Sequence, residues 1–322
     1  MLLCAGKPVF HYLILSVQKI NLNGEWSFKL DPDNRGYTED WFAPSYRLID
    51  SEKSILVPTC WEEFEQDYEG VAWYAKEVQI DASYEGQVCR LIFEASNYRT
   101  TVWVNGKEIG SHEGGYTPFF FQVQDFLTFD ALNLIVVRVL SPIVTSDASI
   151  DGLGPNHMPH WRGGLTAGIW QSVTLDFHQD YWFEQVFYQG SVSDSNFRLQ
   201  ANILSKATQE IDAMVRISLT DSSGKKSFES NEKTHLLQGT NSINVVATLH
   251  EPKLWSCENP HLYSAELSLI INDQTIASQT DYIGLKEFTF KEGRFYLNDT
   301  PIFLQGGFWE GVLRVLPALV LD

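Results

Sequence analysis

Basic residues are scarce in this sequence. It holds 23 lysines and arginines against 41 aspartates and glutamates, which gives a net charge of −18. This excess of negative charge repels phosphate backbones and anionic lipid surfaces. We therefore expect no nucleic-acid partner.

The chain also lacks a long apolar run. The start, Met1 to Leu15, is apolar, but Lys7 is its only early cation and Pro8 interrupts it. The stretch from Tyr12 to Val17 is too short for a spanning helix. We interpret the segment as a lead-in to the first strand, since it is a poor signal peptide. We expect no membrane insertion, and cytoplasm and periplasm both stay open as compartments.

Cysteine is sparse too, with four residues and no CxxC pair. This spacing provides neither a zinc ribbon nor a dithiol redox motif. His157 and His160 have a spacing seen in metal sites, but no nearby carboxylate or cysteine completes a ligand set. We expect no metal and no cofactor. A bridge between Cys60 and Cys89 stays open, although the low cysteine density favours buried free thiols.

Short runs of β-branched and aromatic residues, separated by turn residues, are abundant instead and predict an all-β fold. In the first half they are Arg90 to Ala95, Thr100 to Val104, Asn133 to Val139 and Ser172 to Phe177. Asn105-Gly106 suits a hairpin that needs positive φ at both central positions, so Val102 to Val104 is expected to pair with Lys107 to Ile109. We expect the neighbouring Trp103 to lie in the core.

At 322 residues, with 44% of them hydrophobic, the chain is long enough for two domains with ordinary cores. A second series of strands begins near Trp182, and its spacing suits an immunoglobulin-like sandwich of about seven strands. The boundary is expected near Asp180. A final strand pair, Phe295 to Leu297 and Ile302 to Leu304, is joined by a turn over residues 298–301.

Four blocks of sequence, in this order, resemble the front half of family 2 glycoside hydrolases, the group of β-galactosidases, β-glucuronidases and β-mannosidases. They are GVAWY (70–74), VWVNGKEIGSHEGGY (102–116), AGIWQSVTL (167–175) and LWSCENPHLY (254–263), followed by FYLNDTPIFL (295–304). Two positions depart from the family pattern, because Cys257 replaces a proline and Leu285-Lys286 replaces the commoner Phe-Arg.

The resemblance implies a fold and a domain plan. Residues 1–180 are expected to form a sugar-binding jelly-roll sandwich of the galactose-binding-domain type, and residues 181–285 an immunoglobulin-like β-sandwich. In LWSCENPHLY we expect Leu254, Trp255 and Leu262 to pack on this sandwich. Residues 286–322 are expected to begin a truncated catalytic (β/α)₈ barrel.

The resemblance also implies a chemistry that this chain does not complete. Such enzymes are retaining glycosidases that use two barrel carboxylates, one as acid and one as nucleophile. A barrel takes about 250 residues, far more than Lys286 to Asp322 provide. We therefore expect no catalytic residue here: the chain alone is predicted inactive, although its parent protein would be a glycoside hydrolase.

Substrate-binding residues are expected in the Gly- and Pro-rich segment Asp151 to Gly164. In the resembled family this loop reaches over the barrel mouth, and an acidic residue can touch the sugar. Here the matching position, six before Gly168, is Arg162. We take His160, Trp161 and Arg162 as candidates, because arginine can pair with a carboxylated or sulfated sugar. The alternative is that Arg162 bonds local backbone and Trp161 packs on the domain.

Two other functions stay open. The chain could be a stand-alone carbohydrate-binding module that stacks sugars on exposed rings, with Trp161, Tyr116 and Trp61 as candidates. It could also be an adhesive β-sandwich protein without a sugar role, which predicts a partner interface. The acidic run from Trp61 to Glu69 is interpreted as exposed charge in a loop.

Overall fold

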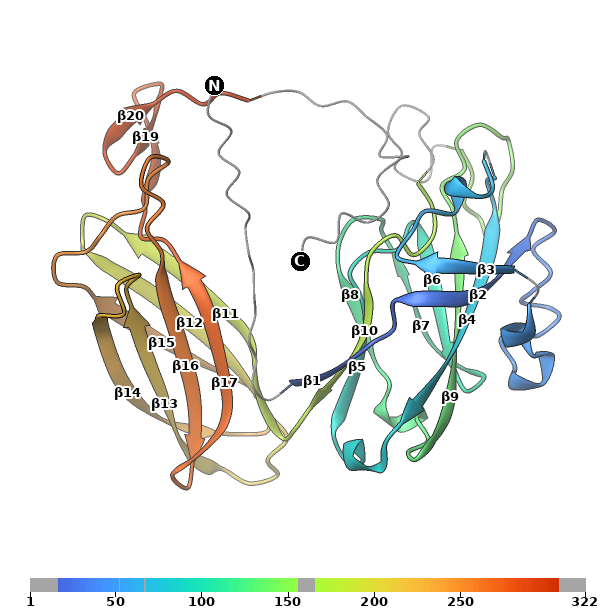
Figure 1. Ribbon diagram of the computed structural model, residues 1–322, viewed down its shortest axis with the longest axis horizontal. Coiled ribbons are helices and arrows are strands. Elements are labelled where there is room, and N and C mark those ends of the chain that lie inside the picture. The colour runs from blue at the N-terminus through green and yellow to red at the C-terminus, as the bar shows by residue number, and fades with distance from the viewer. Residues whose placement is uncertain (1–16, 52, 67, 156–165, 307–322) are drawn as a thin grey trace. The chain divides into compact units, whose positions relative to one another are not determined.

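The computed structural model describes residues 17–51, 53–66, 68–155 and 166–306, which form two compact modules (Figure 1). The first module spans residues 18–177 and the second spans residues 178–306. Strands dominate both modules, and the short helical segments are single 3₁₀ turns. The all-β prediction is therefore confirmed.

The first module contains two antiparallel sheets. The smaller has the order β1 (Val17–Asn21), β10 (Val173–His178), β5 (Val88–Phe93) and β8 (Phe119–Gln122). The larger has the order β3 (Lys53–Val57), β2 (Gly24–Asp31), β4 (Val71–Ile80), β9 (Ala131–Leu140), β6 (Arg99–Val104) and β7 (Lys107–Glu113). Strands distant in sequence thus lie side by side, as in a jelly roll.

The Asn105-Gly106 hairpin is confirmed. Both residues have positive φ, 52° and 80°, and Val104 pairs with Lys107 across the turn. The Asn105 side chain also ties the turn to the next strand, since its amide donates to Asn133 Oδ1 and its oxygen accepts the Leu134 N–H. A bulge between Val102 and Trp103 follows, where the two strands shift register.

Side chains from facing sides of both sheets fill one apolar core in the first module. The alternation of strand residues explains this, because every second side chain points inward. The opposite side of the larger sheet is covered near its centre by a second cluster containing Trp41, Trp73 and Trp103. Trp103 is fully buried there, so its predicted core position is confirmed.

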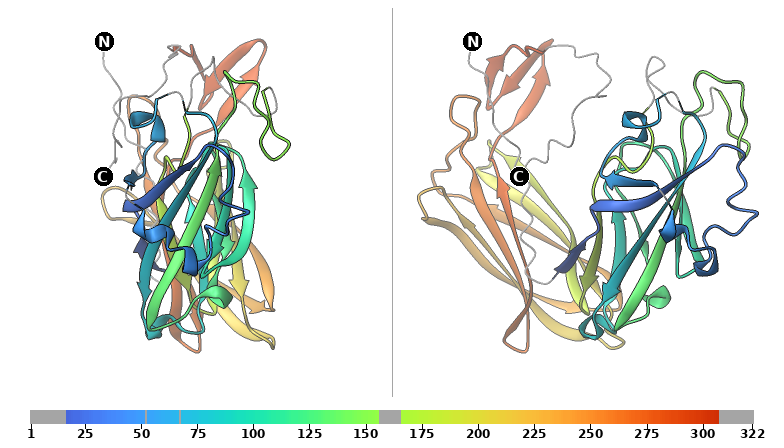
Figure 2. Two further views of the ribbon diagram at one scale, coloured as in Figure 1. Left: turned by 90° about the vertical axis from the view of Figure 1, so that its right-hand side faces the viewer. Right: turned by 45° about the vertical axis from the view of Figure 1, so that its right-hand side comes forward.

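The second module is a sandwich of two antiparallel sheets with a shared apolar core. One has the order β11 (Tyr181–Ser191), β12 (Asn196–Ser205), β15 (Gly239–Thr248), and the other β14 (Lys226–Leu236), β13 (Ile211–Thr220), β16 (Tyr263–Ile271), β17 (Gln274–Ile283). Figure 2 shows these long strands running lengthwise along the module. They amount to the seven strands expected of an immunoglobulin-like plan.

The expected packing of LWSCENPHLY on this sandwich is only partly right. Leu254 packs against the apolar cluster at one end of the module, and Trp255 is half-buried. Leu262, in contrast, is exposed. The next residue, Tyr263, lies in the core instead, because successive side chains of a strand point to opposite faces of the sheet.

A small third sheet ends the described chain, formed by β18 (Phe288–Lys291), β19 (Arg294–Leu297) and β20 (Thr300–Ile302). The expected turn was too long. Asn298 and Asp299 alone turn the chain, with φ of 51° and 60°, and Leu297 pairs with Thr300. A two-residue turn with positive φ at both positions matches the twist of the strands, so the last strand begins earlier than predicted.

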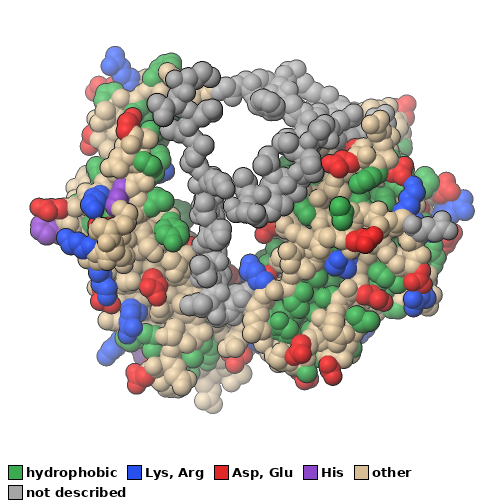
Figure 3. Space-filling model, in the orientation of Figure 1, with side chains coloured by type: hydrophobic (Ala, Val, Ile, Leu, Met, Phe, Trp, Pro, Cys, Tyr) green, Lys and Arg blue, Asp and Glu red, His purple; other side chains and the backbone are tan. Residues whose placement is uncertain are grey.

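Cys60, Cys89 and Cys257 are free thiols, which excludes the Cys60 to Cys89 bridge. Within the described ranges, no helix is long and apolar enough to cross a membrane. Nor do these ranges contain three or more His, Cys, Asp or Glu side chains grouped to hold a metal ion. On the face shown in Figure 3, acidic and basic side chains are interspersed rather than gathered by sign.

Candidate functional site

The three predicted substrate-binding residues, His160, Trp161 and Arg162, lie outside the described residues, as does His157. They belong to the connection between the end of β9 at Leu140 and the start of β10 at Val173. The structure describes both flanks of this connection. We call residues 141–155 the first stem and residues 166–172 the second stem.

Glu69 fixes the beginning of the first stem. Its carboxylate accepts hydrogen bonds from the backbone N–H groups of Val144, Thr145 and Ser146, at 2.9, 2.6 and 3.0 Å. Burial alone would raise the pKa of Glu69, but these hydrogen bonds to the charged form outweigh it and lower the pKa. The ionised carboxylate thus holds three consecutive amides of the stem.

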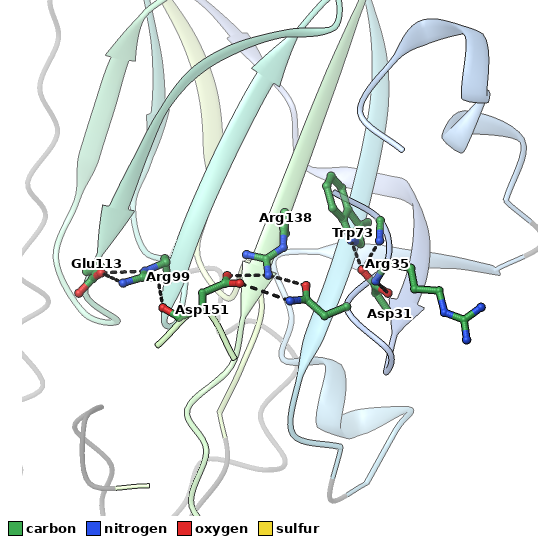
Figure 4. Close-up of polar contacts among 9 residues, drawn as sticks. Asp31, Arg35, Trp73, Arg99, Glu113, Arg138 and Asp151 are labelled. Carbon is green, nitrogen blue, oxygen red and sulfur yellow. Dashed lines mark hydrogen bonds and ion pairs between the residues drawn. The ribbon is translucent and has the colours of Figure 1, made fainter. Parts of the chain in front are cut away.

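Asp151 fixes the stem further on. One of its carboxylate oxygens lies 2.7 Å from the guanidinium of Arg138, which projects from β9 and is only 4% exposed (Figure 4). The same guanidinium donates to Asn34 Oδ1 at 2.8 Å, and Arg99 of β6 donates to the Asp151 carbonyl at 3.3 Å. Two strands of the larger sheet therefore hold the stem at one residue.

The partners of Asp151 are themselves held in place. Arg99 pairs with Glu113 on the neighbouring strand β7, with Nε 2.7 Å from the carboxylate. Asn34 lies in a turn that starts at the buried Asp31, whose carboxylate accepts the Arg35 and Gly36 N–H groups and the Trp73 indole N–H. Figure 4 shows these contacts side by side. Such support restricts the rotamers of the groups that contact the stem.

The second stem is bound into the module by backbone pairing. Asn97 and Gly168 exchange two backbone hydrogen bonds of 3.0 Å, and the Asn97 side-chain amide donates to the Thr166 carbonyl. The Ala167 N–H donates to Glu62 Oε2 at 3.1 Å, and the Ala167 carbonyl accepts the Trp61 N–H. Residues far apart in sequence thereby clamp the stem.

Gly168 is required at this position for two reasons. Its φ is +100°, a backbone conformation that side chains with a Cβ disfavour. A Cβ there would also lie 2.4 Å from the hydroxyl oxygen of the buried Tyr74. The close approach of the second stem to the core therefore depends on glycine.

The rings proposed for sugar stacking are not all available. Tyr116 is exposed and packs edge-on against Trp170, whose indole N–H donates to the Gly115 carbonyl. Trp61, however, is fully buried, so its expected stacking role is wrong. Glu62 is also buried, which corrects the interpretation of this acidic run as entirely exposed. Both side chains face inward because the second stem covers them.

Sequence reasoning missed the residues that hold the stems, namely Glu62, Glu69, Asn97, Arg99 and Arg138. No local motif marks them. Each contacts a residue at least 52 positions away in the chain, in the case of Arg138 through Asn34. The one available signal was the position of Asn97 and Arg99 directly before the predicted strand that carries Trp103.

Two family models match the chain side by side. The model of the sugar binding domain of glycosyl hydrolases family 2 matches residues 63–178, and that of glycosyl hydrolases family 2 matches residues 179–286. Among curated relatives, a β-galactosidase of Thermoanaerobacter pseudethanolicus is 26% identical over 89% of this chain. A putative β-glucuronidase of Formosa agariphila is 29% identical over 73% of it.

Solved structures share the fold. A family 2 member from Bacteroides cellulosilyticus superposes with a TM-score of 0.72 at 20% identity, covering 88% of this chain and 38% of that one. A β-glucuronidase of Ruminococcus gnavus, solved with D-glucuronic acid, gives 0.70 at 22% identity, covering 90% of this chain and 50% of that one.

The chain spans only part of the relatives' length. It covers 38% of the Thermoanaerobacter enzyme and 27% of the Formosa protein. The two adjoining family models and the two all-β modules agree with each other. This chain belongs to glycosyl hydrolases family 2, of which it represents an N-terminal part.

Proposed function

We propose that this chain supplies the non-catalytic N-terminal modules of a retaining β-glycosidase, whose catalytic (β/α)₈ barrel follows them. The observation that carries the proposal is that both stems of the 141–172 connection are held in place. Glu69 and Arg138 bind the first stem, and Asn97 and Glu62 bind the second. A loop fixed at both ends can present side chains to a substrate in a reproducible geometry.

The domain plan is part of the proposal. Residues 1–180 would form the sugar-binding module, residues 181–285 the immunoglobulin-like module, and residues 286–322 the start of the barrel. Retaining hydrolysis needs an acid and a nucleophilic carboxylate about 5–5.5 Å apart. We assign both to the barrel, so that the present modules shape the site without taking part in bond cleavage.

The loop residues His160, Trp161 and Arg162 are the proposed sugar contacts. A tryptophan ring can stack on the apolar face of a sugar. A guanidinium can pair bidentately with a carboxylate, which favours a carboxylated sugar. β-Glucuronidases among the relatives support that substrate class, while β-galactosidases support a neutral one.

The test uses the protein with its barrel attached. We expect Arg162→Ala to raise KM for 4-nitrophenyl β-D-glucuronide by about 10- to 100-fold, the usual worth of a hydrogen bond to a charged group. KM for the matching β-D-galactoside is expected to change much less. Arg198→Ala is a matched control, since Arg198 is exposed on β12 of the second module. Unchanged kinetics for both glycosides with Arg162→Ala would remove the loop from the site.

A further inference from the structure

A polar pocket opens on the first module, on the side of the larger sheet that faces away from the main core. Its volume is about 370 Å³, within the range of roughly 300–1,000 Å³ that small-molecule sites occupy. Its walls come from strands β6, β7 and β9, from Tyr37 just after the turn that starts at Asp31, and from Asp151 of the first stem. The lining residues are Tyr37, Arg99, Thr101, Glu108, Ser111, Glu113, Arg138 and Asp151.

The charged groups of this pocket are fixed before any ligand arrives. Arg99 is paired with Glu113, and Arg138 with Asp151, so each guanidinium is held in one orientation. The Arg138 Nε–H is buried and has no hydrogen-bond partner among the described residues. Because this donor is also out of reach of solvent, a ligand in the pocket would contact the outer nitrogens of the guanidinium and not Nε.

Two hydroxyl groups are available beside these ion pairs. Thr101 of β6 and Ser111 of β7 pair directly across the two strands and both line the pocket. In the described part of the chain, neither side-chain hydroxyl has a hydrogen-bond partner. A hydroxyl both donates and accepts, so this pair can bind another hydroxyl in either sense.

An aromatic ring completes the pocket wall. Tyr37 is 51% exposed, yet its position is fixed, because its ring packs against Phe42 and Trp103. Its hydroxyl donates to Glu108 Oε2 at 3.0 Å, and this hydrogen bond, with the Glu108 charge, raises the pKa of Tyr37. A half-exposed ring that is held firmly offers contact area at little entropic cost.

We propose that this pocket is a binding site for a neutral mono- or disaccharide. Ion-paired guanidinium and carboxylate groups offer donors and acceptors to vicinal hydroxyls, Thr101 and Ser111 add two adaptable ones, and Tyr37 supplies a face for the sugar's C–H groups. Three carboxylates outnumber two guanidinium groups in the lining, which disfavours an anionic sugar. An apolar ligand would cover the Thr101 and Ser111 hydroxyls without offering either of them a hydrogen bond.

The experiment titrates the 322-residue chain with D-galactose, D-glucose, D-mannose and lactose, and with D-glucuronate as the anionic comparison, by calorimetry and by amide chemical shifts. We expect saturable, millimolar binding of at least one neutral sugar and at least tenfold weaker binding of glucuronate. Thr101→Val is expected to weaken binding about three- to tenfold, since it removes one hydrogen bond. Ser111→Trp fills the pocket and is expected to abolish binding.

Ser54→Trp is the matched control. Ser54 is an exposed serine of edge strand β3, at the opposite edge of the same sheet from Ser111 on β7, and we expect this variant to bind as the parent does. Trp161→Ala tests the loop of the proposed function separately: loss of the binding in this variant would assign the sugar to the loop and not to the pocket. Absence of saturable neutral-sugar binding, preference for glucuronate, or binding that survives Ser111→Trp would each overturn the proposal.

Discussion

Arg138 of β9 and Asp151 of the first stem form an ion pair of 2.7 Å, with the arginine almost fully buried. The pair joins a core strand of the larger sheet to the connection that carries the predicted sugar contacts. It also forms a wall of the polar pocket. One contact therefore supports both of the surfaces to which we assign sugar binding.

Breaking this pair is expected to destabilise the module. We predict that Arg138→Gln lowers the free energy of unfolding by about 1–3 kcal/mol, less than for a fully buried pair because Asp151 is partly exposed. Ile150 and Leu153, which exchange backbone hydrogen bonds around Asp151, are expected to show faster amide hydrogen exchange. Asp151→Asn keeps hydrogen-bonding capacity and is expected to cost less. Equal exchange rates in Arg138→Gln and the parent would contradict the role of the pair.

Glu69 is expected to make the first stem sensitive to acid. Its folded pKa lies below the ordinary value of 4.5, so its stabilising contribution is present above about pH 4.5 and is lost as the pH falls through the folded pKa. We predict that Glu69→Gln lowers the free energy of unfolding by about 0.5–1 kcal/mol at neutral pH, since solvent screens this half-buried group.

The measurement is urea unfolding of both proteins as a function of pH. The difference between the parent and Glu69→Gln is expected to shrink as the pH falls below about 4.5. A difference that stays constant or grows towards acid pH would rule out the ionised carboxylate as the stabilising form.

Gly36 is predicted to tolerate no side chain. A Cβ at this position would lie 2.5 Å from Trp73 Nε1 and 2.8 Å from Trp41 Cε3, both in rings of a packed cluster. Gly36→Ala is expected to cost about 1–3 kcal/mol by overpacking, measured by urea unfolding. Gly306, which has open space around it, serves as the control, and Gly306→Ala is expected to change stability very little. Equal stabilities of the two variants would disprove the steric argument.

The cysteines are expected to differ in their rates of reaction with a thiol-specific reagent. Burial raises the pKa of Cys60 to about 12 and raises that of Cys89 still further, so neither forms the reactive thiolate at mildly alkaline pH. Cys257 is exposed. In a Cys4→Ser background, we predict that a thiol-specific reagent labels one cysteine in the folded protein and three after unfolding. Rapid labelling of Cys60, which is half-buried, would contradict the raised pKa of its thiol.

The sequence predicted the features that depend on local chemistry. Asn105-Gly106 marked a hairpin because only a few residue types accept positive φ at two successive positions. The spacing of the strands after Trp182 likewise predicted a sandwich of about seven strands. No signal of this kind marked β14, because its sequence, KSFESNEKTHL, is mostly polar: β14 lies at an edge of its sheet, and Leu236 is its one buried residue.

Long-range contacts could not be predicted in this way. In the sequence, Glu62 is one of several carboxylates in an acidic run. Its hydrogen-bond donor, the Ala167 N–H, lies 105 residues away. In the sequence, Arg138 is a single charged residue within an apolar strand. Its role in holding the first stem depends on contacts with Asn34 and Asp151, which lie in other segments. The lining of the polar pocket likewise combines separate segments, so no stretch of sequence reveals it.

The most direct test of the central claim is a hydrolysis assay with the purified 322-residue chain. The account predicts no release of 4-nitrophenol above the buffer rate from β-D-glucuronide or β-D-galactoside substrates, because we assign both carboxylates of the proposed reaction to the barrel. The same modules joined to the barrel are predicted to turn over at least one of these substrates. Hydrolysis that co-purifies with the isolated chain through gel filtration would contradict the account.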